Sequence, residues 1–372
     1  MPALLPDVDP DGLQEFSVVF TDRSLNHMSE TFQGVMHDID STLKAVYGAD
    51  AVAVVPGGGT FGMEAVARQF AASGPVLVIR NGWFSYRWTQ ILDMAGIAPG
   101  HTVMKARRTH DDPRAPFAPV PADEVAARIR AERPAVVFAP HVETSAGLLL
   151  PDDYLRTVAA ATREVGGLFV LDCIASGTLW VDMAELGVDV LISAPQKGWS
   201  ASPCSALVML SARAEARLAE TRSSSFACDL AKWREIMRAY ENGGHAYHAT
   251  MPTDALRQFR DTMLETRDYG FEKVRAEQIE LGARVRELLE AHGYASVAAE
   301  GFKAPGVVVS YTDDADMKNG SRLRARGLQI AAGVPLQCDE GPDFSTFRIG
   351  LFGLDKLHDV DGTVARLAAA LD

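Results

Sequence analysis

Short apolar segments alternate with longer segments of helical spacing along the first two-thirds of the chain, and this alternation constrains the fold most. The apolar segments are rich in β-branched residues, as strands are. They cover residues 51–56, 75–80, 134–140, 167–173, 188–195 and 204–210, and helical spacing occupies residues 62–72, 122–132 and 151–165. Strands that alternate with helices predict a mostly parallel sheet covered on both faces. The last two segments are too close for a helix between them, so we expect one antiparallel strand there.

The character of the sequence changes near residue 253. Residues 253–292 combine helical spacing with dense mixed charge, which predicts one long helix or two abutting helices. A strand at 306–311 and a terminal helix at 354–371 follow. We therefore expect an N-terminal arm at residues 1–13, a large α/β domain at 14–268 and a smaller C-terminal α+β domain at 269–372.

Composition excludes several classes of protein. The chain has 372 residues, of which 36 are Lys or Arg and 49 are Asp or Glu, so its net charge is −13. This acidic balance argues against binding to nucleic acid or to an anionic membrane. No uncharged apolar run approaches the roughly 20 residues that span a bilayer, and the start lacks the features of a signal peptide. The four cysteines form no C-x-x-C pair and are expected to be reduced. A soluble cytoplasmic enzyme is the resulting expectation.

The segment from residue 190 to residue 212, VLISAPQKGWSASPCSALVMLSA, contains a single charged residue, Lys197. An ammonium group at the end of an apolar strand is costly to desolvate. Burial lowers the pKa of a lysine and frees its amine to form Schiff bases. The segment therefore indicates a catalytic lysine, with a lysine in a surface loop as the alternative interpretation.

Two further patterns fit a ligand site at the carboxyl edge of the sheet. Asp172 ends the apolar segment 167–173, at the edge where open α/β sheets bind ligands. A buried carboxylate there suits a protonated pyridine nitrogen, and a helix N-cap near Ser176 is the alternative. The sequence GGGT at residues 57–60 lies between a predicted strand and a predicted helix. That arrangement offers backbone N–H groups and a helix dipole to a phosphate.

Six motifs, in order from about His27 to the C-terminus, resemble those of class V aminotransferases, in particular the alanine/serine–glyoxylate (serine–pyruvate) group. The motifs are VVPGGGTFGMEAVAR, NGWFSYRW, HVETSAGLLLP, LDCIASGTLWVDMAELGVDVLISAPQK, YHATMP and FRIGLFG. The resemblance implies the fold of a fold-type I enzyme, with a large mostly parallel-sheet α/β domain and a smaller C-terminal α+β domain. It also implies pyridoxal 5'-phosphate as the cofactor, and no metal site is expected.

The resemblance implies a role for each matching residue. Lys197 would bind the cofactor as a Schiff base and move the substrate proton, while Asp172 would hold the pyridinium nitrogen. Phe84, or its neighbour Trp83, would stack on the cofactor ring. The phosphate would contact Gly58, Gly59, Thr60 and Gln196, and the ring hydroxyl and imine would lie near Thr144 and Ser145, with His141 and Glu143 orienting their loop.

Other matching residues imply a shared active site and a carboxylate contact. Tyr247 and Thr250 match residues that reach the phosphate of the neighbouring subunit, which implies a homodimer. Arg348 matches the arginine that binds the substrate carboxylate through paired, charge-assisted hydrogen bonds. A structural ion pair of Arg348 with Asp343 or Asp355 is the alternative.

The N-terminal segment departs from the family. A Pro-Gly-Pro-Thr-like loop followed by His-Arg-Ser is usual there, whereas this chain has EFSVVFTDRSLNHMSETF. We therefore expect a rebuilt wall around the substrate side chain, with Arg23, Asn26 and His27 as its candidate residues. They are equally suited to helix capping or to the surface, because Ser29 resembles the start of a helix.

These expectations combine into a function. The chain would move an amino group from a small amino acid such as alanine or serine to a 2-oxo acid such as glyoxylate or pyruvate, through Lys197. The alternatives are a pyridoxal-phosphate-dependent lyase that performs β-elimination and an aminophosphonate transaminase of the same fold. Desulfuration by a mobile Cys338 and a scaffold without catalytic activity are weaker alternatives.

Overall fold

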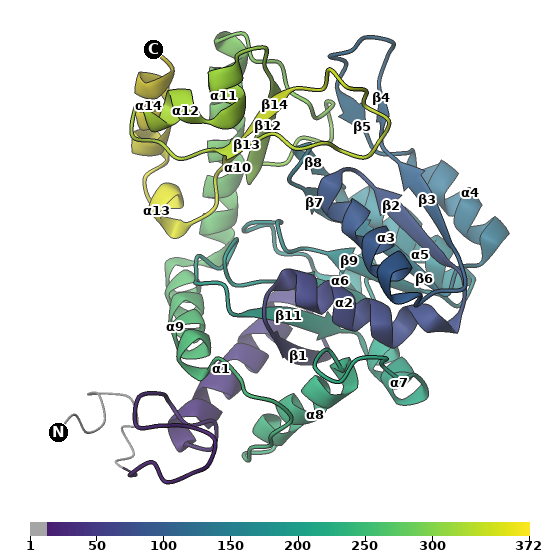
Figure 1. Cartoon of the computed structure of the whole chain (residues 1–372), viewed down its shortest axis with the longest axis vertical. Helices are drawn as coiled ribbons and strands as arrows, with labels where there is room; N and C mark the ends of the chain where they lie inside the picture. The colour runs from purple at the N-terminus through teal and green to yellow at the C-terminus, as the bar shows by residue number, and fades with distance from the viewer. Residues whose placement is uncertain (1–12) are drawn as a thin grey trace.

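The computed structural model describes residues 13–372, so the arm expected at residues 1–13 lies outside the described residues except for its last one. Its centre is a seven-stranded sheet in the order β1-β11-β10-β9-β6-β2-β3. The strands are β1 (Ala51–Pro56), β2 (Val76–Arg80), β3 (His101–Lys105), β6 (Val136–Pro140), β9 (Leu168–Asp172), β10 (Val190–Ser193) and β11 (Ser205–Leu210). Figure 1 shows this sheet among the helices of a large domain, with a smaller domain above it.

The parallel and antiparallel directions of the strands match the sequence prediction, but one edge strand, β3, was not predicted. β11 pairs antiparallel with both β1 and β10, whereas the pairs β10–β9, β9–β6, β6–β2 and β2–β3 are parallel. The antiparallel strand follows β10 after a connection too short for a helix, as expected. β3 was not predicted, because His101–Lys105 is a half-exposed edge strand without a continuous apolar run.

Helices pack on the sheet because most of its strands are buried along their whole length. α2 contacts β1, β10 and β11, α3 contacts β2 and β6, and α5 contacts β9. The helices of this domain are α1 (Glu30–Tyr47), α2 (Gly59–Phe70), α3 (Trp83–Ala95), α4 (Ala122–Glu132), α5 (Asp152–Glu164), α6 (Met183–Leu186), α7 (Ala212–Glu220) and α8 (Leu230–Glu241), with a 3-10 turn at Ala71–Ser73. Aromatic packing adds to this core, where the Trp88 and Phe138 rings stack with centroids 4.1 Å apart.

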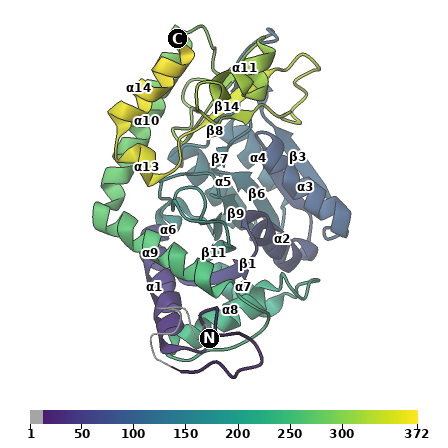
Figure 2. The ribbon, with the colours of Figure 1, turned by 60° about the vertical axis from the view of Figure 1, so that its left-hand side comes forward.

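Two abutting helices connect the domains, as the sequence predicted. α9 (Thr253–Tyr269) and α10 (Phe271–Ala291) meet at Gly270, whose φ of 111° is accessible to glycine. Figure 2 shows α10 rising from the large domain along the side of the smaller one. We propose Gly270 as the junction of the two domains, close to the expected boundary at 268/269.

The smaller domain is built on a three-stranded antiparallel sheet in the order β12-β14-β13. Its elements are β12 (Val307–Tyr311), α11 (Ala315–Asn319), α12 (Ser321–Arg324), β13 (Ala331–Ala332), β14 (Thr346–Gly350), α13 (Leu354–Leu357) and α14 (Val360–Leu371). The single terminal helix expected at 354–371 is divided, because the Asp359 carboxylate accepts from the Gly362 N–H at 2.9 Å and begins a new helix. Two small ribbons, β4 (Arg107–Arg108) with β5 (Phe117–Ala118) and β7 (Val142–Glu143) with β8 (Leu148–Leu149), complete the fold.

None of the helices within residues 13–372 is long and apolar enough to cross a membrane.

Candidate active site

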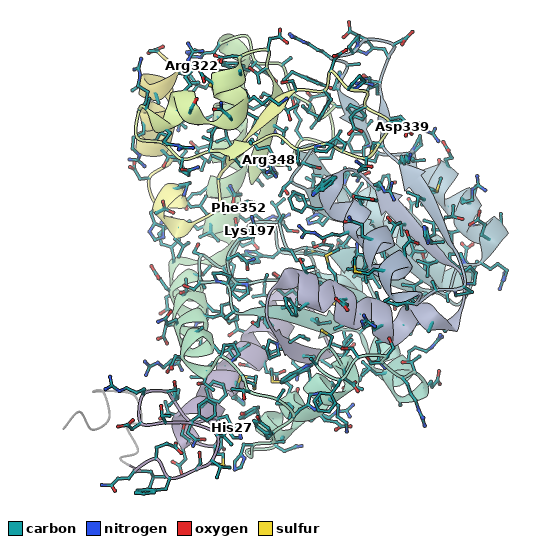
Figure 3. All side chains as sticks on the ribbon, viewed as in Figure 1. His27, Lys197, Arg322, Asp339, Arg348 and Phe352 are labelled. Carbon is teal, nitrogen blue, oxygen red and sulfur yellow. The ribbon has the colours of Figure 1, made fainter. Side chains whose placement is uncertain are left out.

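A cavity of about 400 Å³ lies between the carboxyl ends of the central strands and β14 of the smaller domain. Figure 3 shows Lys197, Phe352 and Arg348 close together in this region. The predicted residues that line the cavity are Gly59, Thr60, Phe84, Thr144, Asp172, Gln196, Lys197 and Arg348. The structure thus brings together residues from Gly59 to Arg348, which lie far apart in the sequence.

Lys197 lies in the connection between β10 and β11, and its ammonium nitrogen is 4.9 Å from the centre of the Phe352 ring. The chain packs tightly here, because a Cβ atom on Gly198 would lie 1.9 Å from the Gly177 carbonyl oxygen. No carboxylate in the described part of the chain pairs with Lys197. Burial and the nearby charge of Arg348 lower the pKa of Lys197, which favours a neutral, nucleophilic amine.

Asp172 is the last residue of β9 and is 6% exposed. One of its carboxylate oxygens accepts from the Ile174 N–H at 2.9 Å, so the residue also caps a turn. Burial raises the pKa of Asp172 to about 7. A cationic partner in the cavity, such as a protonated pyridine nitrogen, would stabilise its charged form.

The start of α2 forms the cradle that the glycine motif predicts. Its N-cap residue is Gly58, which has no capping side chain. Within residues 13–372, the N–H groups of Gly58, Gly59 and Thr60 donate to no recorded acceptor. These groups and the helix dipole are suited to a phosphate. Nearby, the buried Gln196 Oε1 atom also has no hydrogen-bond partner, so a ligand in the cavity would complete its environment.

The Arg348 guanidinium has no carboxylate partner among the described residues. Its Nε atom donates to the Ala332 carbonyl at 2.8 Å, and its guanidinium lies 5.7 Å from the centre of the Phe84 ring. No carboxylate of the described residues lies within ion-pair distance of it, so the alternative pairing with Asp343 or Asp355 is not formed. Asp355 instead pairs with Lys356 at 3.1 Å.

Glu143 connects α3 to the loop that carries Thr144. The fully buried carboxylate accepts hydrogen bonds from the N–H groups of Phe84 and Ser85 and from the side chains of Ser85 and Ser145. Ser145 also accepts from the Trp83 N–H at 2.9 Å. Ser145 therefore lies behind the cavity wall, while Thr144 and Phe84 line it. The ring available to a cofactor is that of Phe84 rather than Trp83, which contacts Tyr86.

Sequence reasoning missed Arg87 and Phe352, which also line the cavity. Arg87 donates to the Thr60 hydroxyl at 3.0 Å and lies 5.0 Å from the centre of the Phe84 ring. The helical spacing of Phe84 and Arg87 could have identified the arginine, because residues three apart share a helix face. No comparable sequence signal points to Phe352.

Besides Gly58 and Ser145, which lie next to lining residues, five predicted site residues lie away from this cavity within the single chain. Tyr247 and Thr250 are hydrogen-bonded to each other at 3.1 Å, and the His27 ring lies 5.5 Å from that of Tyr247. Asn26 bonds Glu15 and the Met28 N–H, while Arg23 is exposed. Figure 3 shows His27 far from Lys197. Within the described part of the single chain, this cluster is therefore separate from the cavity that Lys197 lines.

Cys338 is unsuited to desulfuration. It is buried, its thiol donates to the Arg80 carbonyl at 3.4 Å, and burial raises its pKa to about 12. A catalytic thiol needs the opposite shift and a mobile, accessible position.

Solved structures with a similar fold include several aminotransferases. The chain is similar to an alanine–glyoxylate aminotransferase from Nostoc sp., with a TM-score of 0.77, 23% identity and coverage of 93% of this chain and 89% of that one. It is also similar to an aspartate aminotransferase of subgroup IV from Thermus thermophilus, with a TM-score of 0.75, 25% identity and coverage of 94% and 93%. The fold and the cavity together define a fold-type I pyridoxal-phosphate enzyme.

Sequence relatives identify the family more closely. The chain is 32% identical over 340 residues to a 2-aminoethylphosphonate–pyruvate transaminase of Burkholderia thailandensis, covering 87% of this chain and 84% of the relative. It is 28% identical over 359 residues to a protein of the same name from Paraburkholderia phymatum, covering 93% and 89%. No family model matches the chain. The chain belongs to the class V aminotransferases, and its cofactor is pyridoxal 5'-phosphate.

Proposed function

We propose that the enzyme transfers an amino group from a small amino acid, such as alanine or serine, to glyoxylate or pyruvate. The observation that supports this proposal is that Lys197, Asp172 and Arg348 line one cavity, in which Arg348 lacks a carboxylate partner among the described residues. A free guanidinium beside the catalytic lysine provides a position for a substrate carboxylate.

The bound cofactor supplies an electron sink for the charge that develops on the substrate Cα. We propose that Arg348 orients the substrate through its carboxylate, so that the Cα–H bond points toward Lys197. The Lys197 amine would then remove this proton and hold it for the next step of the transfer. Asp172 would hold the pyridine nitrogen in its protonated form, and the N–H groups of Gly58, Gly59 and Thr60 would hold the phosphate. Phe84 and Thr144 would position the ring.

A second amino donor, an aminophosphonate, is favoured by two observations. The relatives described above are named as 2-aminoethylphosphonate–pyruvate transaminases. The cavity also contains a second guanidinium, that of Arg87, on which a phosphonate could bind.

The visible absorption spectrum of the holoenzyme tests the reaction and its donor. Alanine, serine, aspartate and 2-aminoethylphosphonate are added one at a time. For our proposal, we expect the cofactor band to bleach with alanine or serine and to return with glyoxylate or pyruvate. If only 2-aminoethylphosphonate bleaches the band, the amino donor is an aminophosphonate and not a small amino acid. A persistent band with accumulating 2-oxo acid and ammonia would indicate a lyase.

We also propose a homodimer in which Tyr247 and Thr250 of each subunit complete the cavity of the other. Two exposed aromatic residues near this cluster, Phe16 and Phe226, support a face that is covered in solution. Co-expression of Lys197→Ala and Tyr247→Ala chains tests the arrangement. If the site is shared, a dimer of one Lys197→Ala chain and one Tyr247→Ala chain has one native active site out of two, so activity returns. If the site is not shared, the co-expressed chains should be no more active than a mixture of the two separately expressed variants.

We further propose that Arg23, Asn26 and His27 of each subunit form part of the wall around the substrate side chain in the other subunit's active site.

We also propose a cytoplasmic location, which is supported by four cysteines that are free and buried.

A further inference from the structure

A second and larger cavity, of about 550 Å³, lies in the cleft between the two domains, apart from the one that Lys197 lines. One wall is a single face of α10, where Glu272, Arg275, Ile279, Ala283 and Arg286 follow one another at spacings of three and four residues. The other wall comes from the large domain and includes His141. Its volume is that of a binding site for a small organic molecule.

Arg286 is buried in this cavity and, among the described residues, has no salt-bridge partner, although the charges of Glu290 and Glu300 act on it from a longer distance. The residue is 7% exposed, and its only recorded hydrogen bond is from Nη2 to the Ala304 carbonyl at 2.9 Å. Its Nε atom is buried without a partner, and no carboxylate of the described residues forms an ion pair with it. A guanidinium has five N–H donors, and leaving them unpaired away from water is costly. An anion in the cavity would remove that cost.

Arg275 adds a second positive charge three helical turns away on the same face of α10. It is half-buried and has no recorded hydrogen bond or ion pair within the described part of the chain. Its charge reaches across the cavity to His141, where burial and Arg275 together lower the pKa of the imidazole to about 4. A third cation on the cavity wall, Lys303, is already neutralised by Glu300 at 2.8 Å and Glu290 at 3.5 Å.

The acidic residues of the cavity lie at its mouth. Asp152, Asp182, Glu185 and Glu272 line it, and all four are exposed. Glu185 is paired with Arg156 at 2.5 Å, and Asp182 caps α6 by accepting from the Glu185 N–H at 2.9 Å. The buried end is therefore positive, and the four carboxylates of the rim are exposed to solvent, two of them with the contacts given above.

We propose that this interdomain cavity is an anion-binding site, in which Arg286 and Arg275 hold a carboxylate or phosphate group of a small organic acid. The site is separate from the one that binds cofactor and substrate, and the proposal does not depend on the amino donor.

The location of the cavity would connect such a ligand to catalysis. The Thr178 hydroxyl donates to the Val274 carbonyl of α10 at 3.0 Å, and Gly177 packs against Gly198, next to Lys197. The Gln278 side chain donates to the Leu351 carbonyl at 3.2 Å, three residues after Arg348. An anion that fixes α10 against the large domain would therefore also fix both sides of the catalytic cavity.

Calorimetric titration of the holoenzyme with succinate and, separately, with inorganic phosphate tests the proposal at low ionic strength. We expect saturable binding of at least one probe, and the one that binds identifies a carboxylate or a phosphate ligand. Arg275→Met and Arg286→Met should each weaken binding about tenfold or more, because each removes charge-assisted hydrogen bonds. Arg275 is half-buried and unpartnered, so its variant is expected to fold even if the Arg286 variant does not.

Arg284→Met is the matched control. Arg284 lies on the same helix but pairs with Glu280 and Asp361, so this variant loses the same charge and should keep the affinity. Arg348→Met separates binding at the catalytic cavity from binding at the cleft. The proposal is overturned if wild-type enzyme binds neither probe, if both cleft variants retain wild-type affinity, or if Arg348→Met alone abolishes binding.

Discussion

Glu143 accepts two hydrogen bonds from Ser85, at 2.9 Å from the backbone nitrogen and 2.7 Å from the side-chain oxygen. Its other oxygen accepts from the Phe84 N–H at 3.2 Å. The carboxylate therefore fixes the first turn of α3, which carries Phe84, to the loop that carries Thr144. One buried side chain thus positions two walls of the catalytic cavity.

Glu143→Gln should weaken both stability and cofactor binding. The amide replaces one acceptor oxygen by an NH₂ group, which leaves buried N–H and O–H donors without a partner and costs about 2 kcal/mol. Urea unfolding of the apoenzyme and cofactor titration measure the two effects. Glu340→Gln is the control, because Glu340 also accepts backbone N–H groups, from Leu336 and Cys338, in a loop that does not line the catalytic cavity. Equal cofactor affinities in the two variants would contradict the positioning role.

Arg348→Met should raise the KM for the amino donor by about tenfold to a hundredfold, because it removes a charge-assisted pair with the substrate anion. The dissociation constant of the cofactor should change little. Steady-state kinetics and cofactor titration give the two values. Arg322→Met is the control in the same domain, because Arg322 is paired with Asp314 at 2.6 Å on the surface. An equal loss of cofactor affinity would mean that Arg348 is structural.

Asp172 should make the stability of the apoenzyme depend on pH. Burial raises its pKa in the folded state to about 7, from an ordinary value of 3.8. Between these values the folded state binds the proton more strongly than the unfolded state, so this contribution to stability decreases as the pH rises from about 4 to 7. Urea unfolding at pH 5 and pH 8 should show a smaller decrease for Asp172→Asn than for wild type. The same decrease in both proteins would exclude Asp172 as its source.

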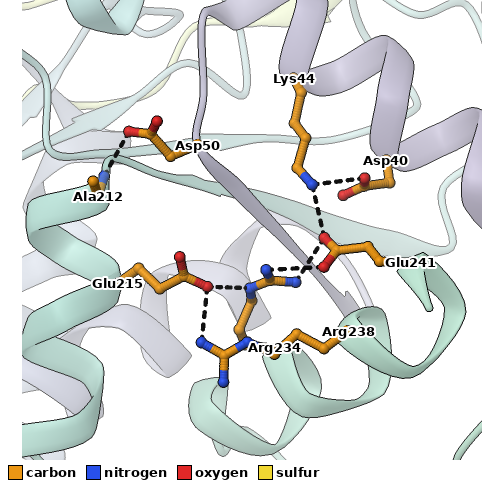
Figure 4. A network of polar contacts seen from close by, with 8 residues as sticks. All are labelled: Asp40, Lys44, Asp50, Ala212, Glu215, Arg234, Arg238 and Glu241. Carbon is orange, nitrogen blue, oxygen red and sulfur yellow. Dashed lines mark hydrogen bonds and ion pairs between the residues drawn. The ribbon is translucent and has the colours of Figure 1, made fainter.

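Arg234 stabilises the packing of α8 through two carboxylates (Figure 4). Its side chain is 7% exposed and donates to Glu215 at 2.7 Å and to Glu241 at 2.8 Å. Arg234→Met should destabilise the fold by about 3 kcal/mol, because it leaves two partly buried carboxylates without this partner. Arg238→Met is the matched control, because Arg238 also contacts Glu215 but is 52% exposed. This variant should lower the free energy of unfolding by less than about 1 kcal/mol. Urea unfolding of both variants measures the difference.

Most of the fold could be predicted because its strands are buried on both faces and read as uninterrupted apolar runs. β3 (His101–Lys105) was not predicted, because it is an edge strand that keeps polar residues and has no uninterrupted apolar run. Asp172 and Lys197 could be placed in one site because Asp172 ends one buried strand and Lys197 follows another at the same edge of the sheet.

Contacts between distant elements could not be predicted. The pairing of Arg87 with Thr60 depends on the angle between α2 and α3, and the contact of Phe352 with Lys197 depends on how the domains pack. Neither has a signature in the local sequence. The cluster of Tyr247 with His27 was equally hidden, because its members are distant in the sequence.

The short connection from β10 to β11 has a consequence for how the enzyme acquires its cofactor. Ser193 and Ser205, at the two ends of this connection, both belong to strands that pair with neighbours in the central sheet. The backbone around Lys197 is therefore anchored on both sides before any ligand arrives. We therefore expect little conformational entropy to be lost there on cofactor binding, and in its proposed role Lys197 would be held ready for attack by the sheet itself.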